Sequence, residues 1–273
     1  MRIELLIIDP QNDFCHKDGA LFVPGATEDM GRVAEMIDRI GHKLYDIHST
    51  LDSHRLIDIA HPIFWINSEG KHPGDYDFTI ITAADVRDGK WAPTNPAARQ
   101  RATAYVEALE DNARYPLCVW PPHCLIGSWG HNVIQSLFDS FKRWEEQNFA
   151  QIDFVTKGSN PWTEHYSAVQ ADVPDPQDPT TSLNRKFIDE LANADEILLA
   201  GEARSHCLAN TVRDIANNFG DDSYIKKLVL LTDATTDVAD PPGTTMFTDM
   251  GEGFVSEMVG RGMQLSTTTE YLK

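Results

Sequence analysis

The sequence predicts an α/β fold, a three-layer α/β/α sandwich with a mainly parallel central sheet. Short apolar, β-branched runs alternate with amphipathic stretches of helical spacing along most of the chain. This alternation is typical of a parallel sheet with helices on both faces. The length of 273 residues suits one domain with an insertion, and is enough to bury a core without disulfides or a structural metal.

The expected strands are the short apolar runs. The first, at 3–8, ends at Asp9 and Pro10. In parallel sheets, functional groups gather at the carboxyl ends of the strands, so the residues that follow each run are of special interest. The other runs lie at 44–50, 61–66, 116–120, 152–156, 196–201, 227–234 and 264–272.

The expected helices fill the intervals between these runs. Thr27 is predicted to cap a helix that runs to Ile40, with acidic residues in its first turn, where they favour the helix dipole. Ser182 is predicted to cap another helix that ends near Ala194. Further helices are expected at 132–144, at 206–218 and within 243–262.

The stretch from about Gly70 to Asn112 interrupts the alternation. It contains Pro73, Pro93 and Pro96 before a helical run near its end. Proline and glycine punctuate turns, and a long irregular segment inside a compact domain is usually functional. We interpret the chain as a single domain, 1–273, with a lid-like insertion at about 70–112.

Composition excludes several classes of partner. The chain has 23 Lys and Arg against 42 Asp and Glu, a formal charge of −19, which argues against nucleic acid and an anionic membrane surface. No apolar run approaches transmembrane length, and the first residues do not resemble a signal peptide. The four cysteines have no regular spacing, so we expect free thiols and a cytoplasmic protein.

Three residues could carry catalysis. Asp9, after the first strand, could act as a base, or could be a turn residue before proline. Lys157 ends a strand and would need a carboxylate partner if buried, but could also be solvated. Cys207 lies where a helix is expected to begin, which favours a thiolate and oxyanion binding, although a lone cysteine is more often structural.

Another group of residues could bind a metal ion and a flat ring. Asp52 and His54, two positions apart after a strand, would share one face of an extended segment and could bind one metal ion. His61 and His123 are further candidates, and ordinary surface residues are the alternative. Trp120, which precedes two prolines, could stack on a ring or simply pack in a turn. The sequence has no P-loop and no G-x-S-x-G elbow.

Five motifs occur in order through nearly the whole chain. They are IIDPQNDF from residue 7, TLDSH from 50, WPPHC from 120, VTKG from 155 with EHYSA from 164, and GEARSHCLANTVRDIA from 201. Five ordered motifs are far more specific than any one of them. As an ordered set they resemble the isochorismatase-like cysteine hydrolases, and the nicotinamidases most of all.

The resemblance implies a role for each matched residue. It implies a catalytic triad of Asp9, Lys157 and Cys207, with Cys207 as the nucleophile. The backbone N–H groups of Ala203 and Cys207 would form the oxyanion hole, and the Glu202–Ala203 bond would be cis. The implied metal ligands are Asp52, His54 and His123, and the implied ring-binding residues are Phe14 and Trp120.

Two features depart from the family pattern, the spacing of His61 from His54 and the length of the segment 70–112. His61 lies further from His54 than the additional metal-site histidine of shorter nicotinamidases does, so it is a candidate ligand only. Glu164, in the EHYSA motif, is expected to contact either the substrate or the metal ligands. The segment 70–112 is long for the family and could reshape the pocket.

The implied activity is hydrolysis of the carbon–nitrogen bond of a linear amide, nicotinamide, through a cysteine thioester. One divalent metal ion is implied, with zinc preferred and iron or manganese also suited to the ligands, and so is a homo-oligomer. One alternative is an amidase for a different or larger amide. Another is a catalytically silent binding or assembly module, against which the complete triad argues. Ether hydrolysis of the isochorismatase type does not use a cysteine nucleophile.

Overall fold

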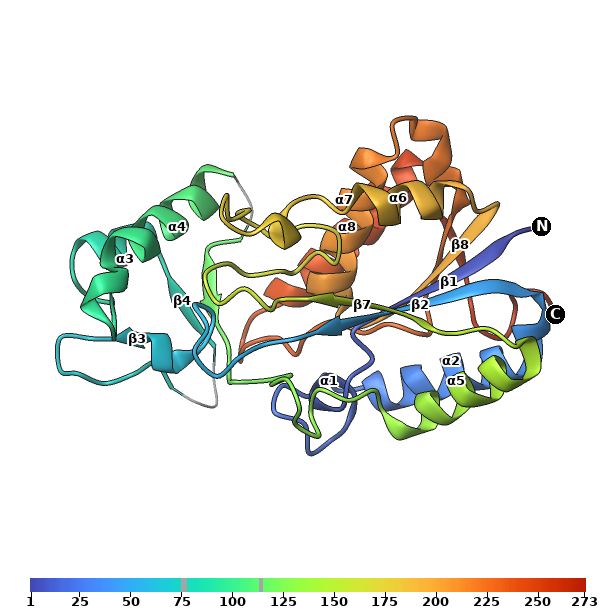
Figure 1. Cartoon of the computed structure of the whole chain (residues 1–273), viewed down its shortest axis with the longest axis horizontal. Coiled ribbons are helices and arrows are strands. Elements are labelled where there is room, and N and C mark those ends of the chain that lie inside the picture. Colours follow the sequence, from blue (N-terminus) through green and yellow to red (C-terminus); the bar gives the residue numbers. More distant parts are fainter. Residues whose placement is uncertain (75–77, 113–114) are drawn as a thin grey trace.

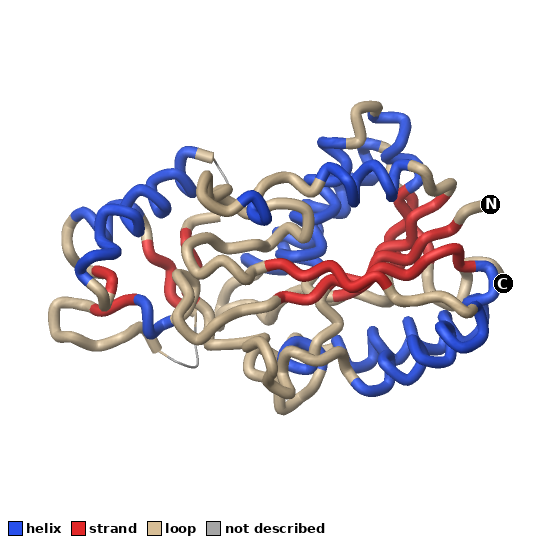
Figure 2. The backbone as a smooth tube through the Cα atoms, viewed as in Figure 1, coloured by secondary structure: helices blue, strands red, loops and turns tan. Residues whose placement is uncertain are grey.

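A six-stranded parallel sheet forms the centre of the computed structural model, which describes residues 1–74, 78–112 and 115–273 (Figures 1 and 2). Every pair of neighbouring strands in this sheet is parallel. In spatial order the strands are β10 (Gln264–Ser266), β9 (Leu228–Leu231), β8 (Glu196–Gly201), β1 (Ile3–Ile8), β2 (Leu44–Asp52) and β7 (Asp153–Lys157).

Helices cover both faces of this sheet, which confirms the predicted three-layer sandwich. Side chains of β1 alternate between the two faces, so Leu5 and Ile7 join one core while Leu6 and Ile8 join the other. The first face is covered by α2 (Ala26–Ile40) and α5 (Gln135–Asn148), with the short α1 (Asn12–Cys15) near the strand ends (Figure 1). The second face is covered by α6 (Arg185–Ala192), α7 (Ala209–Asn218) and α8 (Met246–Arg261).

Both predicted helix caps are wrong. Helix α2 begins at Ala26 behind Gly25, whose φ of 108° is readily available only to glycine, and Thr27 instead donates its hydroxyl proton to the Cys15 carbonyl at 2.6 Å. Helix α6 is capped by Asn184, whose side chain accepts from the Phe187 N–H at 3.2 Å. Ser182 ends the preceding 3₁₀ turn.

Two predicted strands lie outside the central sheet. The run at 61–66 forms β3 (Trp65–Ile66), antiparallel to β5 (Ala92–Pro93). The run at 116–120 forms β6 (Leu117–Val119), antiparallel to β4 (Thr79–Ile81). With α3 (Ala83–Arg87) and α4 (Arg99–Asp111), they enclose a separate apolar core at one end of the molecule (Figure 1).

This outlying unit overlaps the segment 70–112 that the sequence analysis interprets as an insertion, of which residues 75–77 lie outside the described residues. The division of the chain into one domain and a lid-like insertion stays a prediction. Within the described ranges, none of the helices is both long and apolar enough to span a bilayer.

A buried histidine in the sheet predicts a loss of stability at alkaline pH. His48 on β2 contacts Asp153 on β7 at 2.8 Å and Glu4 on β1 at 3.5 Å. Burial would lower the pKa of His48, but the two carboxylates outweigh it and raise that pKa to about 9. The stabilisation is therefore fully present below the unfolded pKa of about 6.5 and is lost as pH rises through about 9.

Between pH 6 and pH 9.5, we expect the free energy of unfolding to fall by about 1–3 kcal/mol more in wild type than in His48→Gln. This energy range allows for solvent screening at the half-exposed Asp153. Urea unfolding of both proteins at the two pH values measures this difference. Equal losses in the two proteins would contradict the prediction.

Candidate active site

The candidate catalytic residues follow four adjacent strands of the central sheet. Asp9 follows β1, Asp52 ends β2, Lys157 ends β7, and Cys207 lies in the turn after β8. The register places Asp52 directly opposite Lys157. Because all four strands are parallel, their carboxyl ends meet at one edge of the sheet and bring these side chains together.

Lys157 contacts each of the other three residues of the cluster. Its buried Nζ lies 3.0 Å from Asp9 Oδ2, 3.0 Å from Asp52 Oδ1 and 3.6 Å from Cys207 Sγ, and it donates to the His165 carbonyl at 2.9 Å. Asp9 Oδ1 accepts a second hydrogen bond, from the Thr50 hydroxyl at 2.5 Å. The acid, the cation and the thiol that the sequence analysis selects are therefore in one connected group.

The charges of this group follow from burial and from neighbours. Burial raises the pKa of Asp9 although Lys157 opposes the shift. Burial would lower the pKa of Lys157, but Asp52 and Asp9 raise it well above its ordinary value. Burial raises the pKa of the Cys207 thiol well above its usual range, so the resting group is a thiol. A base must therefore remove the thiol proton when the sulfur reacts.

The segment 201–208 carries the thiol on a helical turn. Gly201 has a φ of 105°, and a Cβ there would lie 2.1 Å from the Ile8 carbonyl, so only glycine fits. The peptide bond between Glu202 and Ala203 is cis, as the resemblance implies. The expected helix at 206–218 starts earlier, as a π-helical turn at Arg204–Leu208 that leads into α7.

Asp52, His54 and His123 form a group that can hold a metal ion. Asp52 Oδ2 lies 3.0 Å from His54 Nε2 and 3.4 Å from His123 Nε2, and one ligand atom of each residue lies within 4.8 Å of the others. The second ring nitrogens are engaged by Asp58 at 3.2 Å and by the Pro121 carbonyl at 2.8 Å. Such contacts orient metal-binding histidines, so the residues fit a divalent cation.

His61 lies beside this group. Its ring centroid is 5.1 Å from that of His54 and 5.5 Å from that of His123. Its Nδ1 lies 3.0 Å from the Arg55 carbonyl, while its buried Nε2 has no hydrogen-bond partner among the residues that the structure describes. A free nitrogen lone pair next to the other ligands suits a fourth metal contact.

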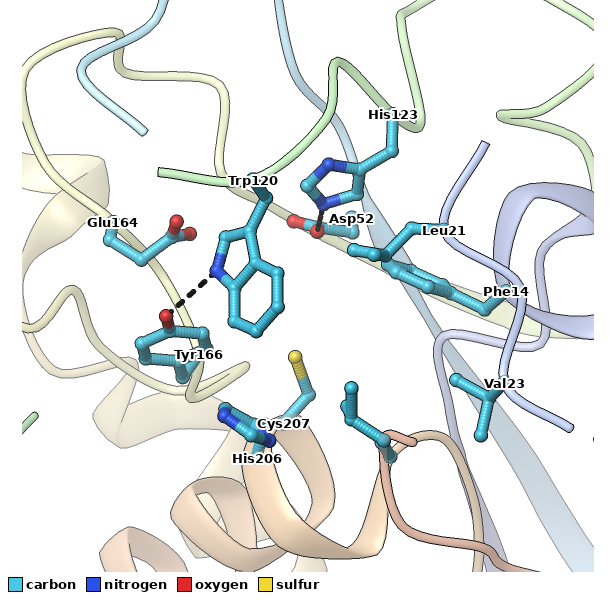
Figure 3. A pocket seen from close by; sticks show the side chains of 12 residues that line it. Phe14, Leu21, Val23, Asp52, Trp120, His123, Glu164, Tyr166, His206 and Cys207 are labelled. Atoms are coloured by element: carbon cyan, nitrogen blue, oxygen red, sulfur yellow. Dashed lines mark hydrogen bonds and ion pairs between the residues drawn. The ribbon is translucent and has the colours of Figure 1, made fainter. Parts of the chain in front are cut away.

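A pocket of about 430 Å³, including its opening, joins the thiol to the metal-binding group (Figure 3). Cys207 lies on one wall, and Asp52 and His123 lie further along the pocket. Phe14 and Trp120, both selected from the sequence, line it, and Trp120 donates to the Tyr166 hydroxyl at 3.0 Å. The pocket is mostly apolar, as small-molecule sites usually are.

Glu164 and Ala203 also line the pocket, as the sequence analysis expects of site residues. Burial raises the pKa of the Glu164 carboxyl to about 7. The sequence analysis missed two polar lining residues. Tyr166 lies inside the EHYSA motif, and His206 directly precedes the thiol, so proximity to the motifs was the available signal. The other missed lining residues are Leu21, Val23 and Val238, which no motif marks.

One curated protein and several solved structures are similar to this chain. No family model matches the chain. A nicotinamidase of Saccharomyces cerevisiae (strain ATCC 204508 / S288c) is 24% identical over 238 residues, which cover 87% of this chain and 89% of that protein.

Solved structures give the same result for the fold. The yeast nicotinamidase structure matches with a TM-score of 0.62 and 19% identity, over 96% of this chain and 98% of that chain. The pyrazinamidase of Pyrococcus horikoshii in complex with zinc matches with a TM-score of 0.56 and 18% identity, over 98% and 99% of the two chains. The predicted fold and the predicted resemblance to nicotinamidases are thereby confirmed.

Proposed function

We propose that this chain is a metal-dependent cysteine amidohydrolase that converts nicotinamide to nicotinate and ammonia, in the cytoplasm and as part of NAD salvage. The observation that carries the proposal is the position of Lys157, 3.0 Å from Asp9 and 3.6 Å from Cys207, beside a pocket that also reaches Asp52 and His123. Similarity to a yeast nicotinamidase supports the choice of substrate.

In the first half of the proposed reaction, the Cys207 sulfur attacks the amide carbon and its proton passes to Asp9. Lys157 stays charged and stabilises the carboxylate that accepts the proton. Negative charge then develops on the amide oxygen, toward the N–H groups of Ala203 and Cys207. Loss of one such donor typically slows an enzyme about 100- to 1,000-fold.

In the second half, the carbon–nitrogen bond breaks and Asp9 gives the proton to the leaving ammonia. The product on the protein is a thioester of Cys207. Asp9 then removes a proton from water, which attacks the thioester carbon, and the carboxylic acid leaves as the thiol is restored. Proton and electron pairs balance, and the protein returns to its starting state.

The pocket residues bind and orient the ring. Phe14 and Trp120 are proposed to hold the two faces of the pyridine, with Glu164 as a polar contact. Asp52, His54 and His123, with His61 as a further ligand, are proposed to hold zinc, for which iron or manganese could substitute. When bound, the cation supplies a positive charge that orients the ring nitrogen. Such orientation can lower a barrier by several kcal/mol, about 100-fold or more in rate.

Ammonia release from nicotinamide, before and after chelation, tests the proposal. We expect release by the metal-loaded protein, a loss of about 100-fold or more on chelation, and recovery when metal returns. Full activity in protein shown by elemental analysis to be free of metal would contradict the metal requirement. The His61→Gln variant should recover at a higher metal concentration than wild type if His61 is a ligand.

A panel of amides in the same assay separates nicotinamide from other substrates. Release of ammonia only from larger amides would show that the substrate is not nicotinamide but a larger amide. The segment 70–112 would then be the first place to look for residues that bind it. No release from any amide by folded, metal-loaded protein would favour a silent binding module. Light scattering on the same sample tests the proposed homo-oligomer.

A further inference from the structure

Two buried carboxyl groups, those of Glu202 and Asp29, bind the same residue next to the segment that carries Ala203. Glu202, directly after β8, is 1% exposed, and Asp29, in the first turn of α2, is 2% exposed. Thr236 joins them, because its N–H donates to Glu202 Oε2 at 3.1 Å and its hydroxyl donates to Asp29 Oδ2 at 2.6 Å.

Among the residues that the structure describes, only Asp29 of the two carboxyls forms an ion pair with a cation. Arg32 donates to Asp29 Oδ1, and the N-terminal end of α2 also favours a negative charge on Asp29. Arg204, two residues after Glu202, pairs instead with Asp237. Within the described ranges, no lysine or arginine forms an ion pair with Glu202.

One carboxyl oxygen of Glu202, which makes no hydrogen bond to the described residues, indicates where a proton lies. Glu202 Oε1 is buried and has no hydrogen-bond partner in the part of the chain that the structure describes. A second negative charge beside Asp29 would be costly, whereas a proton on Oε1 could be donated to Asp29. Burial raises the pKa of Glu202 well above its ordinary value, and Asp29 raises it further.

We propose that Glu202 is a positioning residue that shares one proton with Asp29 and thereby fixes the segment that carries the oxyanion donor Ala203. This role rests on the proposed function. Two hydrogen bonds already tie that segment to the loop after β9, since Arg204 N–H donates to the Thr236 carbonyl at 2.9 Å and Val238 N–H donates to the Ser205 hydroxyl at 3.1 Å. Loss of the proton places two negative charges between these segments and loosens Ala203.

Other titratable groups face this pair and must be separated from it. Cys15 is a titratable thiol beside the pair, and burial raises its pKa while Glu202 and Asp29 raise it further. The charged groups near the pair are Arg32 on α2 and Arg204 and Asp237 on the two tied segments, and Glu252 on α8 lies near Arg204. Cys15→Ala is therefore the control variant for the pH profile.

Glu202→Gln and Glu202→Leu test the role in turnover. The glutamine amide can donate to Asp29 and accept from Thr236 at every pH. We therefore expect the kcat of Glu202→Gln to lie within about threefold of wild type at neutral pH, and to fall less than that of wild type as the pH becomes alkaline. Leucine does neither, so we expect kcat to fall about 10- to 100-fold with KM changed less than about threefold. Cys15→Ala should keep the wild-type profile. A wild-type alkaline profile in Glu202→Gln, or wild-type kcat in Glu202→Leu, would overturn the proposal.

Infrared spectroscopy of glutamate-labelled protein tests the proton without any substrate. We expect a protonated carboxyl band at neutral pH in wild type that Glu202→Gln lacks and that disappears at alkaline pH. Absence of that difference at neutral pH would overturn the shared proton, whatever the substrate proves to be. Its presence in a protein that does not hydrolyse nicotinamide would support the shared proton and reject the proposed substrate.

Discussion

Replacement of Cys207 by alanine is expected to reduce ammonia release from nicotinamide to the uncatalysed background. No other group in the cluster can form the thioester, because Asp9 and Lys157 act on protons and charge. Removal of a nucleophile from a catalytic triad typically costs about a millionfold in kcat. Ammonia release over long incubations measures the loss, and mass spectrometry of acid-quenched wild type should detect a nicotinoyl adduct that Cys207→Ala lacks.

The same variant should keep its fold and its metal. Cys207 lies outside the Asp52–His54–His123 group, so the metal content after loading should equal that of wild type. Cys15→Ala is the matched control, since Cys15 is also a buried thiol but lies in the core beside α2. We expect Cys15→Ala to keep turnover. Retention of more than about one hundredth of wild-type activity by Cys207→Ala would exclude Cys207 as the nucleophile.

The sequence could predict the central sheet and the convergence of the site because both follow from local patterns. An apolar, β-branched run such as 3–8 is read without knowledge of its neighbours, and parallel order then places Asp9 and Lys157 at one edge. Strand partners are different. The run at 116–120 is as apolar as a central strand, yet it forms β6, which pairs with β4 outside the central sheet. The sequence could not predict this partner, because a three-residue strand does not encode which sheet it joins.

Features that depend on tertiary contacts could not be predicted. Thr27 is a common capping residue, but Gly25 supplies the left-handed turn that starts α2, which leaves the Thr27 hydroxyl to bind Cys15. Pocket residues such as Val238 come from loops whose path depends on distant elements. Glu202 and Asp29 both bind Thr236 but lie 173 positions apart, and neither lies in a pattern that indicates the other.

Replacement of Lys157 by methionine should have the largest combined effect on stability and turnover. One buried ammonium lies between two buried carboxylates, each at 3.0 Å. Removal of one partner from a buried charge pair typically costs about 3–5 kcal/mol, because the remaining charge loses its counterion. Without Lys157, which lowers the pKa of Asp9, that pKa should rise further, so less of Asp9 would be ionised and able to accept the thiol proton. We therefore expect kcat to fall about 1,000-fold or more.

A double variant and bound metal separate the two effects. Asp9→Asn combined with Lys157→Met removes both members of one pair, so its free energy of unfolding should lie closer to wild type than that of Lys157→Met alone, while kcat should not recover. A divalent cation on Asp52 should reduce the loss, because it replaces one of the missing positive contacts. Urea unfolding of the single and double variants, with and without metal, measures the effect of the second substitution and the effect of the cation on the free energy of unfolding. Wild-type stability in metal-free Lys157→Met would show that Asp9 and Asp52 do not depend on Lys157 for their charge, and the proposed role of Lys157 in holding the base would then be wrong.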